Sequence, residues 1–198
     1  MQKLFIILLI PLFILQCEDQ TSETSPILLL EDFEDDSFSA DGWSVIEYDV
    51  PFEKWQISTE KSLSGLRSIG SATLSSENNL SMLYIYRLPT VGSYGNYRIS
   101  FYVNLECQDS NSDAKISTLL QSSNTTPAGE QSIQSRSTVM HQQVGPTSDW
   151  EKIEFEFNTN AIGTPPNLLW IFQGRSGESN IASDCRCFID DFEFTRSY

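Results

Sequence analysis

Acidic residues stand at both ends of the chain, each inside a short apolar segment. Asp190 and Asp191 interrupt the C-terminal segment 188–194, and Glu34 follows the leucine run 28–30. In a strand, Asp190 would share a face with three phenylalanines of its segment, because side chains two residues apart point the same way. A carboxylate on a core face needs a positive partner, several hydrogen-bond donors or a metal ion. We therefore expect the two ends of the chain to pair as neighbouring strands, where a bound cation would relieve the repulsion between acids.

The sequence offers little that could perform catalysis. It has no Gly-x-Ser-x-Gly, no His-Glu-x-x-His and no glycine loop of the kind that binds phosphates. The only histidine, His141, lies in a polar segment. Glu154 and Glu156 share a strand parity with Lys152, which indicates a solvated face rather than the two carboxylates of a glycosidase. We expect a protein that is not an enzyme.

Aromatic residues in polar surroundings are the better candidates for ligand contacts. A sugar site presents flat rings to solvent, surrounded by amides and carboxylates that bind hydroxyl groups. Trp55 lies between a lysine and a glutamine, and Tyr102 falls on the polar parity of its strand. Tyr84 and Tyr86 complete the predicted ligand-binding set, and the alternative is that all four are ordinary aromatics of a sheet face. The other three tryptophans, Trp43, Trp150 and Trp170, are expected in the core.

The N-terminus predicts export. Residues 4–15 are almost wholly apolar and follow a basic start at Lys3. The run is too short for a membrane span, which needs about 20 residues, and is typical of a signal peptide. With Cys17 at its end it resembles the lipobox of bacterial lipoproteins, which implies lipidation of Cys17 as the mature N-terminus, although Gln16 departs from the usual small residue. The alternative is a secretory signal with an incidental cysteine.

The chain divides into a signal peptide (1–16), a polar, flexible tether (17–26) and one domain (27–198). The whole chain has 27 acidic and 12 basic residues, a net charge of −15. This excess argues against nucleic acid or an anionic membrane surface as partner. We therefore expect membrane contact only through the N-terminal lipid anchor, in the bacterial cell envelope at the outer membrane or cell surface.

Three cysteines lie inside the domain, and disulfides persist in exported proteins. We expect Cys185 and Cys187, separated by one residue, on opposite faces of an extended segment, where a bridge between them would be strained. The prediction is a disulfide from Cys107 to either of them. A zinc site is the weaker alternative, because the cysteines and His141 show no recognisable ligand spacing.

Alternating apolar residues predict strands separated by turns. The clearest segments are 97–105 and 150–157, which read as half-buried antiparallel strands, and 168–172, apolar on both parities and expected to be central. The segment 133–143 is polar and hard to assign. No long stretch has the 3.6-residue period of a helix. Two packed antiparallel sheets follow.

Several short motifs occur along the domain in an order that can be compared with known families. They are Asp32-Phe33-Glu34-Asp35 with Gly42-Trp43, the segment 52–57, Ser64-Gly65 with Ser68, the segment 97–103, Asp149-Trp150 and the segment 188–192. In this order they resemble the galactose-binding-like jelly rolls, which include carbohydrate-binding modules of bacterial glycosidases and the MAM domains of cell-surface proteins. The resemblance implies an all-β fold, a two-sheet antiparallel jelly-roll β-sandwich.

The same resemblance implies a structural calcium ion, because members of these families often hold one between the first and last strands. Matched residue by residue, it nominates Glu34 with Asp190 or Asp191, and backbone oxygens near Ser64 and Gly65. Ca²⁺ takes about 6–8 oxygen ligands, which such a set can begin to supply.

The function implied is that of a lipid-anchored, non-catalytic binding module at the cell surface or in the periplasm. Its ligand would be a glycan or a glycosylated or matrix protein. Carbohydrate modules usually accompany a catalytic domain, and we recognise none in this sequence. The alternative is a MAM-like protein–protein interaction or adhesion domain with no sugar site.

Overall fold

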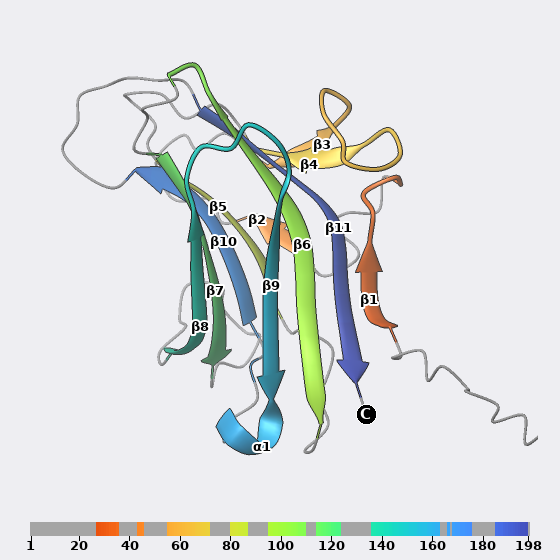
Figure 1. Cartoon of the computed structure of the whole chain (residues 1–198), viewed down its shortest axis with the longest axis vertical. Helices are drawn as coiled ribbons and strands as arrows, with labels where there is room; N and C mark the ends of the chain where they lie inside the picture. The colour runs from red at the N-terminus through yellow and green to blue at the C-terminus, as the bar shows by residue number, and fades with distance from the viewer. Residues whose placement is uncertain are drawn as a thin grey trace, which may run out of the picture.

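The computed structural model describes residues 27–35, 43–45, 55–71, 80–86, 95–109, 114–123, 136–162, 166, 168–175 and 185–197. Within residues 43–45, 80–86 and 136–139, and at several positions of 168–175, it describes the backbone alone. The predicted signal, Cys17 and the tether lie outside these residues. The described chain forms eleven strands in two antiparallel sheets packed face to face (Figure 1).

Sheet A contains both ends of the domain. Its strands, in spatial order, are β3 (Gln56–Ser58), β4 (Ser68–Gly70), β11 (Cys185–Ser197), β6 (Asn96–Cys107) and β9 (Glu151–Asn158), and β1 (Ile27–Glu31) also pairs with β11. The β1–β11 pairing is antiparallel, with Leu30 opposite Glu193. The prediction that the first and last strands are neighbours is therefore confirmed.

Sheet B forms the second layer. Its order is β2 (Trp43–Val45), β5 (Leu80–Tyr86), β10 (Leu168–Arg175), β7 (Ala114–Ser123) and β8 (Arg136–Val144). The apolar strand β10 is central, as its sequence predicts, and β8 occupies the polar stretch that the sequence left unassigned. A four-residue helix, α1 (Thr159–Ile162), follows β9. No helix in the described part of the chain is long and apolar enough to cross a bilayer.

The core lies between the sheets and follows the two-residue period of the strands. In β6, Ile99 and Phe101 are fully buried, and in β9 Ile153 and Phe155 are buried between exposed acids and a lysine. Phe101 stacks on Phe192 of β11 with ring centroids 5.9 Å apart. Burial of each such side chain stabilises the folded state by about 1.5–3 kcal/mol relative to leaving it exposed.

A β-bulge in β11 overturns the predicted parity of Asp190. The register jumps between Asp190, opposite Tyr102, and Glu193, opposite Ser100. Asp191 has the positive φ of 50° that accompanies this irregularity. Phe192 consequently packs in the core, whereas Asp190 lies on the outer side of sheet A. The prediction that Asp190 shares a face with all three phenylalanines is wrong, because strict alternation does not survive an inserted residue.

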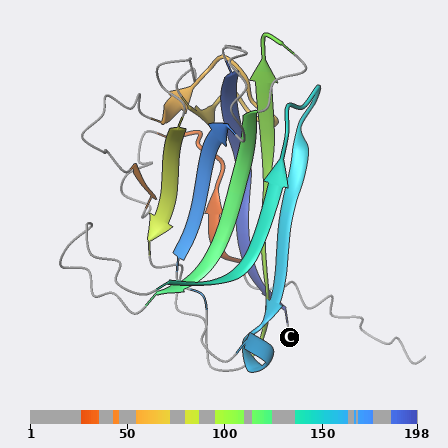
Figure 2. The same cartoon turned by 90° about the vertical axis from the view of Figure 1, so that its left-hand side faces the viewer.

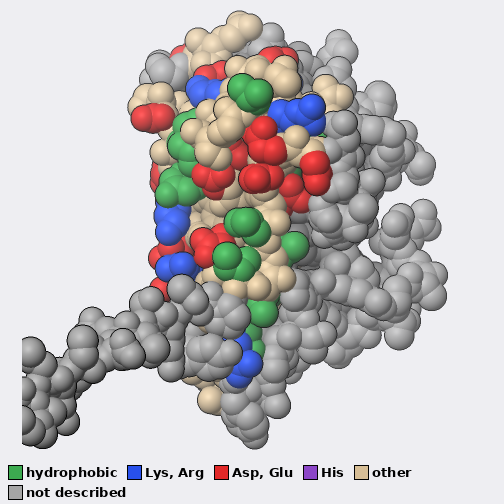
Figure 3. All heavy atoms as spheres, turned by 90° about the vertical axis from the view of Figure 1, so that its right-hand side faces the viewer, with side chains coloured by type: hydrophobic (Ala, Val, Ile, Leu, Met, Phe, Trp, Pro, Cys, Tyr) green, Lys and Arg blue, Asp and Glu red, His purple; other side chains and the backbone are tan. Residues whose placement is uncertain are grey.

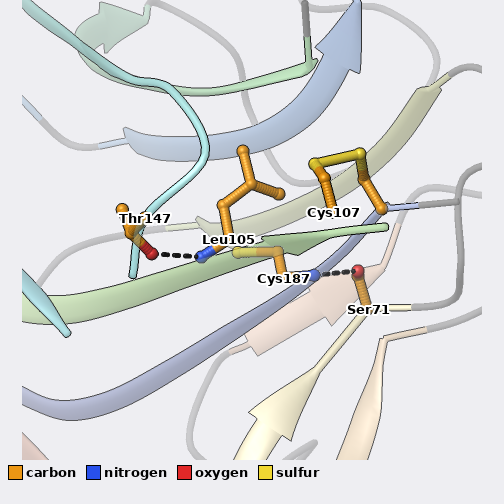
Figure 4. The surroundings of a disulfide bond; sticks show 6 residues. Ser71, Leu105, Cys107, Thr147 and Cys187 are labelled. Carbon is orange, nitrogen blue, oxygen red and sulfur yellow. Dashed lines mark hydrogen bonds between the residues drawn. A yellow bond between two sulfur atoms is a disulfide. The ribbon is translucent and has the colours of Figure 1, made fainter. Parts of the chain in front are cut away.

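The disulfide joins Cys107 of β6 to Cys185 of β11, which lie opposite each other in register (Figure 4). Cys187 is a free, fully buried thiol, and burial raises its pKa well above the ordinary value. Its backbone N–H donates to Ser71 Oγ at 2.9 Å. The predicted pairing is confirmed, with Cys185 as the partner. The expectation of opposite faces is wrong, since residues i and i+2 of a strand share a face.

Candidate functional site

Trp55 is not a ligand platform. Its side chain is 3% exposed and belongs to the core cluster between the sheets. Its indole N–H is buried without a hydrogen-bond partner among the described residues. Gln56, the polar residue that follows Trp55, is exposed, as alternation requires, so it says nothing about the exposure of the ring. Its prediction as a ligand contact is therefore corrected.

The predicted tyrosines belong to different sheets. Tyr84 and Tyr86 are positions of β5 in sheet B, whereas Tyr102 lies in β6 of sheet A, half-buried on the outer face opposite Lys152. The core separates the outer faces of the two sheets. These three residues cannot contribute to one binding site.

Sheet B places the position of Trp170 next to those of two predicted tyrosines, a juxtaposition that the sequence did not reveal. Tyr84 is in register with Trp170 of β10, and Tyr86 with Leu168. The position of Trp170 alternates with Leu169 and Ile171, both fully buried in the core. By strand parity, Tyr84, Tyr86 and Trp170 are therefore outer-face positions of sheet B. Figure 2 shows the strands of sheet B on the side that faces the viewer. The sequence predicts a core residue at Trp170, and the register places this position on the outer face of sheet B.

Polar side chains follow on the neighbouring strands of the same face. Ser117 of β7 and Gln143 of β8 are register partners, and Gln143 Nε2 donates to Ser117 Oγ at 2.9 Å. His141, opposite Leu119, is exposed. Amide, hydroxyl and imidazole groups therefore border the aromatic positions, which is the composition expected of a site for a polar ligand with apolar faces.

On sheet A, the carboxylates from the two chain ends bind one loop, residues 61–67. Glu34 Oε1 accepts hydrogen bonds from the backbone N–H groups of Leu66 and Arg67, both at 2.8 Å. Asp190 Oδ2 accepts from Leu63 at 2.7 Å and Ser64 at 3.2 Å. The structure thus brings Glu34 and Asp190 together on this loop, as the sequence predicts.

Asp190 is 0% exposed because the 61–67 loop lies over it. Burial raises the pKa of Asp190, and the N–H bonds from Leu63, Ser64 and Asp191 oppose this only in part. Several donors therefore satisfy the buried carboxylate, one of the three solutions open to it.

Gly65 lets the loop approach Glu34. Its φ is +59°, in the left-handed region, and a Cβ atom at this position would lie 2.2 Å from Glu34 Oε1. Only glycine has both the conformational freedom and the space. This gives the Ser64-Gly65 motif a physical reason.

The remaining oxygens decide how well the site fits calcium. Ser64 Oγ donates to Asp191 Oδ1 at 2.6 Å, while Glu34 Oε2 and Asp191 Oδ2 accept no hydrogen bond from the described residues. These two oxygens fit a hard cation. The described residues contain no group of three or more Asp, Glu, His or Cys side chains that could hold a metal, so carbonyls and water would supply the other ligands. Calcium stays a prediction.

No protein-family model matches the sequence, and no curated protein matches it. Solved structures do share its architecture. The CBM22-1 xylan-binding domain from Paenibacillus barcinonensis Xyn10C has a TM-score of 0.52 and 18% identity, over 87% of this chain and 95% of that one. The CBM22-2 xylan-binding domain of the same protein has a TM-score of 0.56 and 16% identity, over 86% and 99%. The K1 cleaved adhesin domain of Lys-gingipain from Porphyromonas gingivalis W83 has a TM-score of 0.51 and 15% identity, over 86% and 98%.

The chain has the galactose-binding-like jelly-roll fold. This jelly roll has one outer face per sheet, and the two differ in kind. Sheet B offers aromatic positions with neutral polar neighbours, and sheet A offers Tyr102 among charged residues. Sequence alternation alone could not separate them, because the assignment of Trp170 depends on its register with β5 and β7.

Proposed function

We propose that this jelly roll is a non-catalytic glycan-binding module and that it binds its ligand through the outer face of sheet B. The observation that carries the proposal is the register of Tyr84 with Trp170, next to the position of Tyr86. Two of the structures that share the fold are xylan-binding domains, which supports a glycan as ligand.

The chemistry suits sugars. Rings of pyranose sugars have apolar C–H faces, which stack on aromatic side chains, while their hydroxyl groups exchange hydrogen bonds with amides and hydroxyls. Gln143 and Ser117 already bond to each other across β7 and β8, which fixes the Gln143 amide before a ligand arrives. Fixed polar groups lose less entropy on binding.

A glycan array tests the proposal. The purified domain, residues 27–198, should be retained on at least one class of plant, bacterial or host polysaccharide. Hydrolysis products should not accumulate from the bound polymer. Circular dichroism should first confirm that the domain is folded. If the folded domain then retains no glycan on the array, the proposal is contradicted.

Export through a lipid anchor is part of the proposed function. The apolar run 4–15 followed by Cys17 supports it. Mass spectrometry of the mature protein should show an acylated N-terminus at Cys17. An unmodified terminus elsewhere would remove the anchor and leave export in place.

A structural calcium ion is also proposed, bound by Glu34 and by Asp190 or Asp191. Glu34 Oε2 and Asp191 Oδ2 support it as oxygens without hydrogen bonds from the described residues. Ca²⁺ would neutralise acids from both chain ends and would take no part in ligand chemistry.

A second candidate function, adhesion to another protein, is favoured by exposed leucines on the side of the molecule that carries β1. Leu66 is 77% exposed and Leu63 39%, and on β1 Leu30 is 59% exposed. Figure 3 shows hydrophobic side chains among acidic ones on this side. Exposed apolar patches of this kind mark contact sites. Loss of protein binding on Leu66→Ser, with glycan binding unchanged, would support this second function.

A further inference from the structure

Charge is distributed unequally between the two outer faces. The chain has 27 acidic and 12 basic residues. The outer-face register positions of sheet A include five acids, Glu106, Glu154, Glu156, Asp190 and Glu193, and three bases, Arg98, Lys152 and Arg186. The corresponding positions of sheet B include no acid; they are Ser44, Leu80, Met82, Tyr84, Tyr86, Lys115, Ser117, Leu119, Gln121, Ser123, Arg136, Thr138, His141, Gln143, Leu168, Trp170, Phe172 and Gly174.

The basic residues of this face lie at its β7–β8 side. Lys115 is half-buried, and its ammonium group has no hydrogen-bond or ion-pair partner among the described residues. His141 is exposed two positions from Gln143, and Arg136 occupies a further outer-face position on β8. In an acidic protein, the described outer-face strand positions of sheet B are therefore neutral to basic.

The types of hydrogen-bonding group on this face point to the ligand. Ionised Asp and Glu are acceptors only, and they are the groups that would bind pairs of sugar hydroxyls. None occupies an outer-face strand position of sheet B. Lys and Arg, which occupy two of these positions, donate only, and charge-assisted bonds from them to carboxylates are about twice as strong as neutral ones. Described strand positions that are rich in donors and include no carboxylate fit a ligand that supplies carboxylates.

We propose that the ligand of the outer face of sheet B is an anionic glycan whose sugars carry carboxylate groups. This inference rests on the proposed function and names its ligand class. The aromatic positions would stack on the sugar rings, and Lys115, with Arg136 and His141, would bind the carboxylates. On sheet A the bases Arg98, Lys152 and Arg186 form ion pairs with Glu193, Glu154 and Glu60, so this face competes poorly for the same polymer.

Affinity electrophoresis with matched polymers tests this. Polygalacturonate and alginate are compared with the neutral polymers obtained by reducing their carboxyl groups, and dextran sulfate serves as a general polyanion. We expect retardation by an unreduced uronate polymer, at least about threefold weaker binding to its reduced form, and weaker binding as salt rises because exposed ion pairs are screened.

Charge reversal on each face provides the control. Lys115→Glu should weaken binding to the uronate polymer about three- to tenfold, whereas Lys152→Glu on sheet A should leave it within about twofold. Circular dichroism confirms that both variants fold.

Equal binding to unreduced and reduced polymers would overturn the uronate inference and leave the glycan-binding function standing. Binding to dextran sulfate that both variants reduce alike would show general polyanion attraction and would also overturn it. Failure to bind any glycan would remove the proposed function itself.

Discussion

Gly65 fixes the 61–67 loop through a single backbone conformation. A methyl group at this position meets both a strained φ of +59° and Glu34 Oε1 at 2.2 Å. We expect Gly65→Ala to lower the free energy of unfolding by about 1–3 kcal/mol. Urea denaturation measures this. Gly145→Ala is the matched control, because its Cβ meets nothing within 4 Å. Equal urea midpoints for the two variants would mean that the loop accommodates the added methyl group without cost, which would contradict this account.

Asp190 should reveal its burial through the pH dependence of stability. Because burial raises its pKa above the ordinary 3.8, the folded state keeps a proton over a pH range in which the unfolded state has released it. That stabilisation is fully present below pH 3.8 and is lost as pH rises through the folded pKa. Asp190→Asn removes the titrating carboxyl group and with it this pH-dependent stabilisation.

The melting temperature of the wild type relative to Asp190→Asn should therefore fall as pH rises from about 4 to about 7. Asp149→Asn serves as the control for removing a carboxylate, because the Asp149 side chain is exposed. A difference between wild type and Asp190→Asn that stays constant across this pH range would contradict the account of Asp190.

Predictions about single residues hold where they depend only on which strands are neighbours. The acids Glu34 and Asp190 do converge, because their strands lie at the two chain ends and pair. The burial of Trp55 and the outer-face position of Trp170 differ from the sequence predictions, because the face that a strand turns to the core decides where each position lies. That choice is made by register with strands distant in sequence.

Among the elements, the β6–β11 pair is tied by the Cys107–Cys185 disulfide, across 78 residues of sequence. Replacing both cysteines by serine should lower the free energy of unfolding by about 2–5 kcal/mol, because the unfolded chain gains a long open loop. Peptide mapping without reduction should link these two residues and leave Cys187 alkylated only after unfolding, since its thiol is fully buried. A Cys107–Cys187 peptide would contradict this pairing.

Strands with clean alternation, such as β6 and β9, could be predicted closely, because one face is core and the other solvent. Strand β8 could not, because its residues are mostly polar and it is held by pairing with β7 at the edge of sheet B. The bulge in β11 also leaves no local signal. It is visible only when Asp190 and Glu193 are aligned with β6.

For the molecule as a whole, calcium would tie the two chain ends through the 61–67 loop. A ligand that binds only the folded state stabilises it by about 2.7 kcal/mol at a hundredfold excess over Kd. We expect a chelator to lower the melting temperature by several degrees, and Glu34→Gln to abolish the difference. An unchanged melting curve would show that amide donors alone hold these acids.

The central claim is that sheet B, not sheet A, carries the ligand site of this jelly roll. Isothermal titration calorimetry with the best glycan from the array tests it with two aromatic truncations, Trp170→Ala on sheet B and Tyr102→Ala on sheet A. The account predicts at least about a tenfold loss of affinity for Trp170→Ala, equivalent to about 1.4 kcal/mol, and less than about a twofold change for Tyr102→Ala. The reverse pattern, with both variants folded, would contradict it.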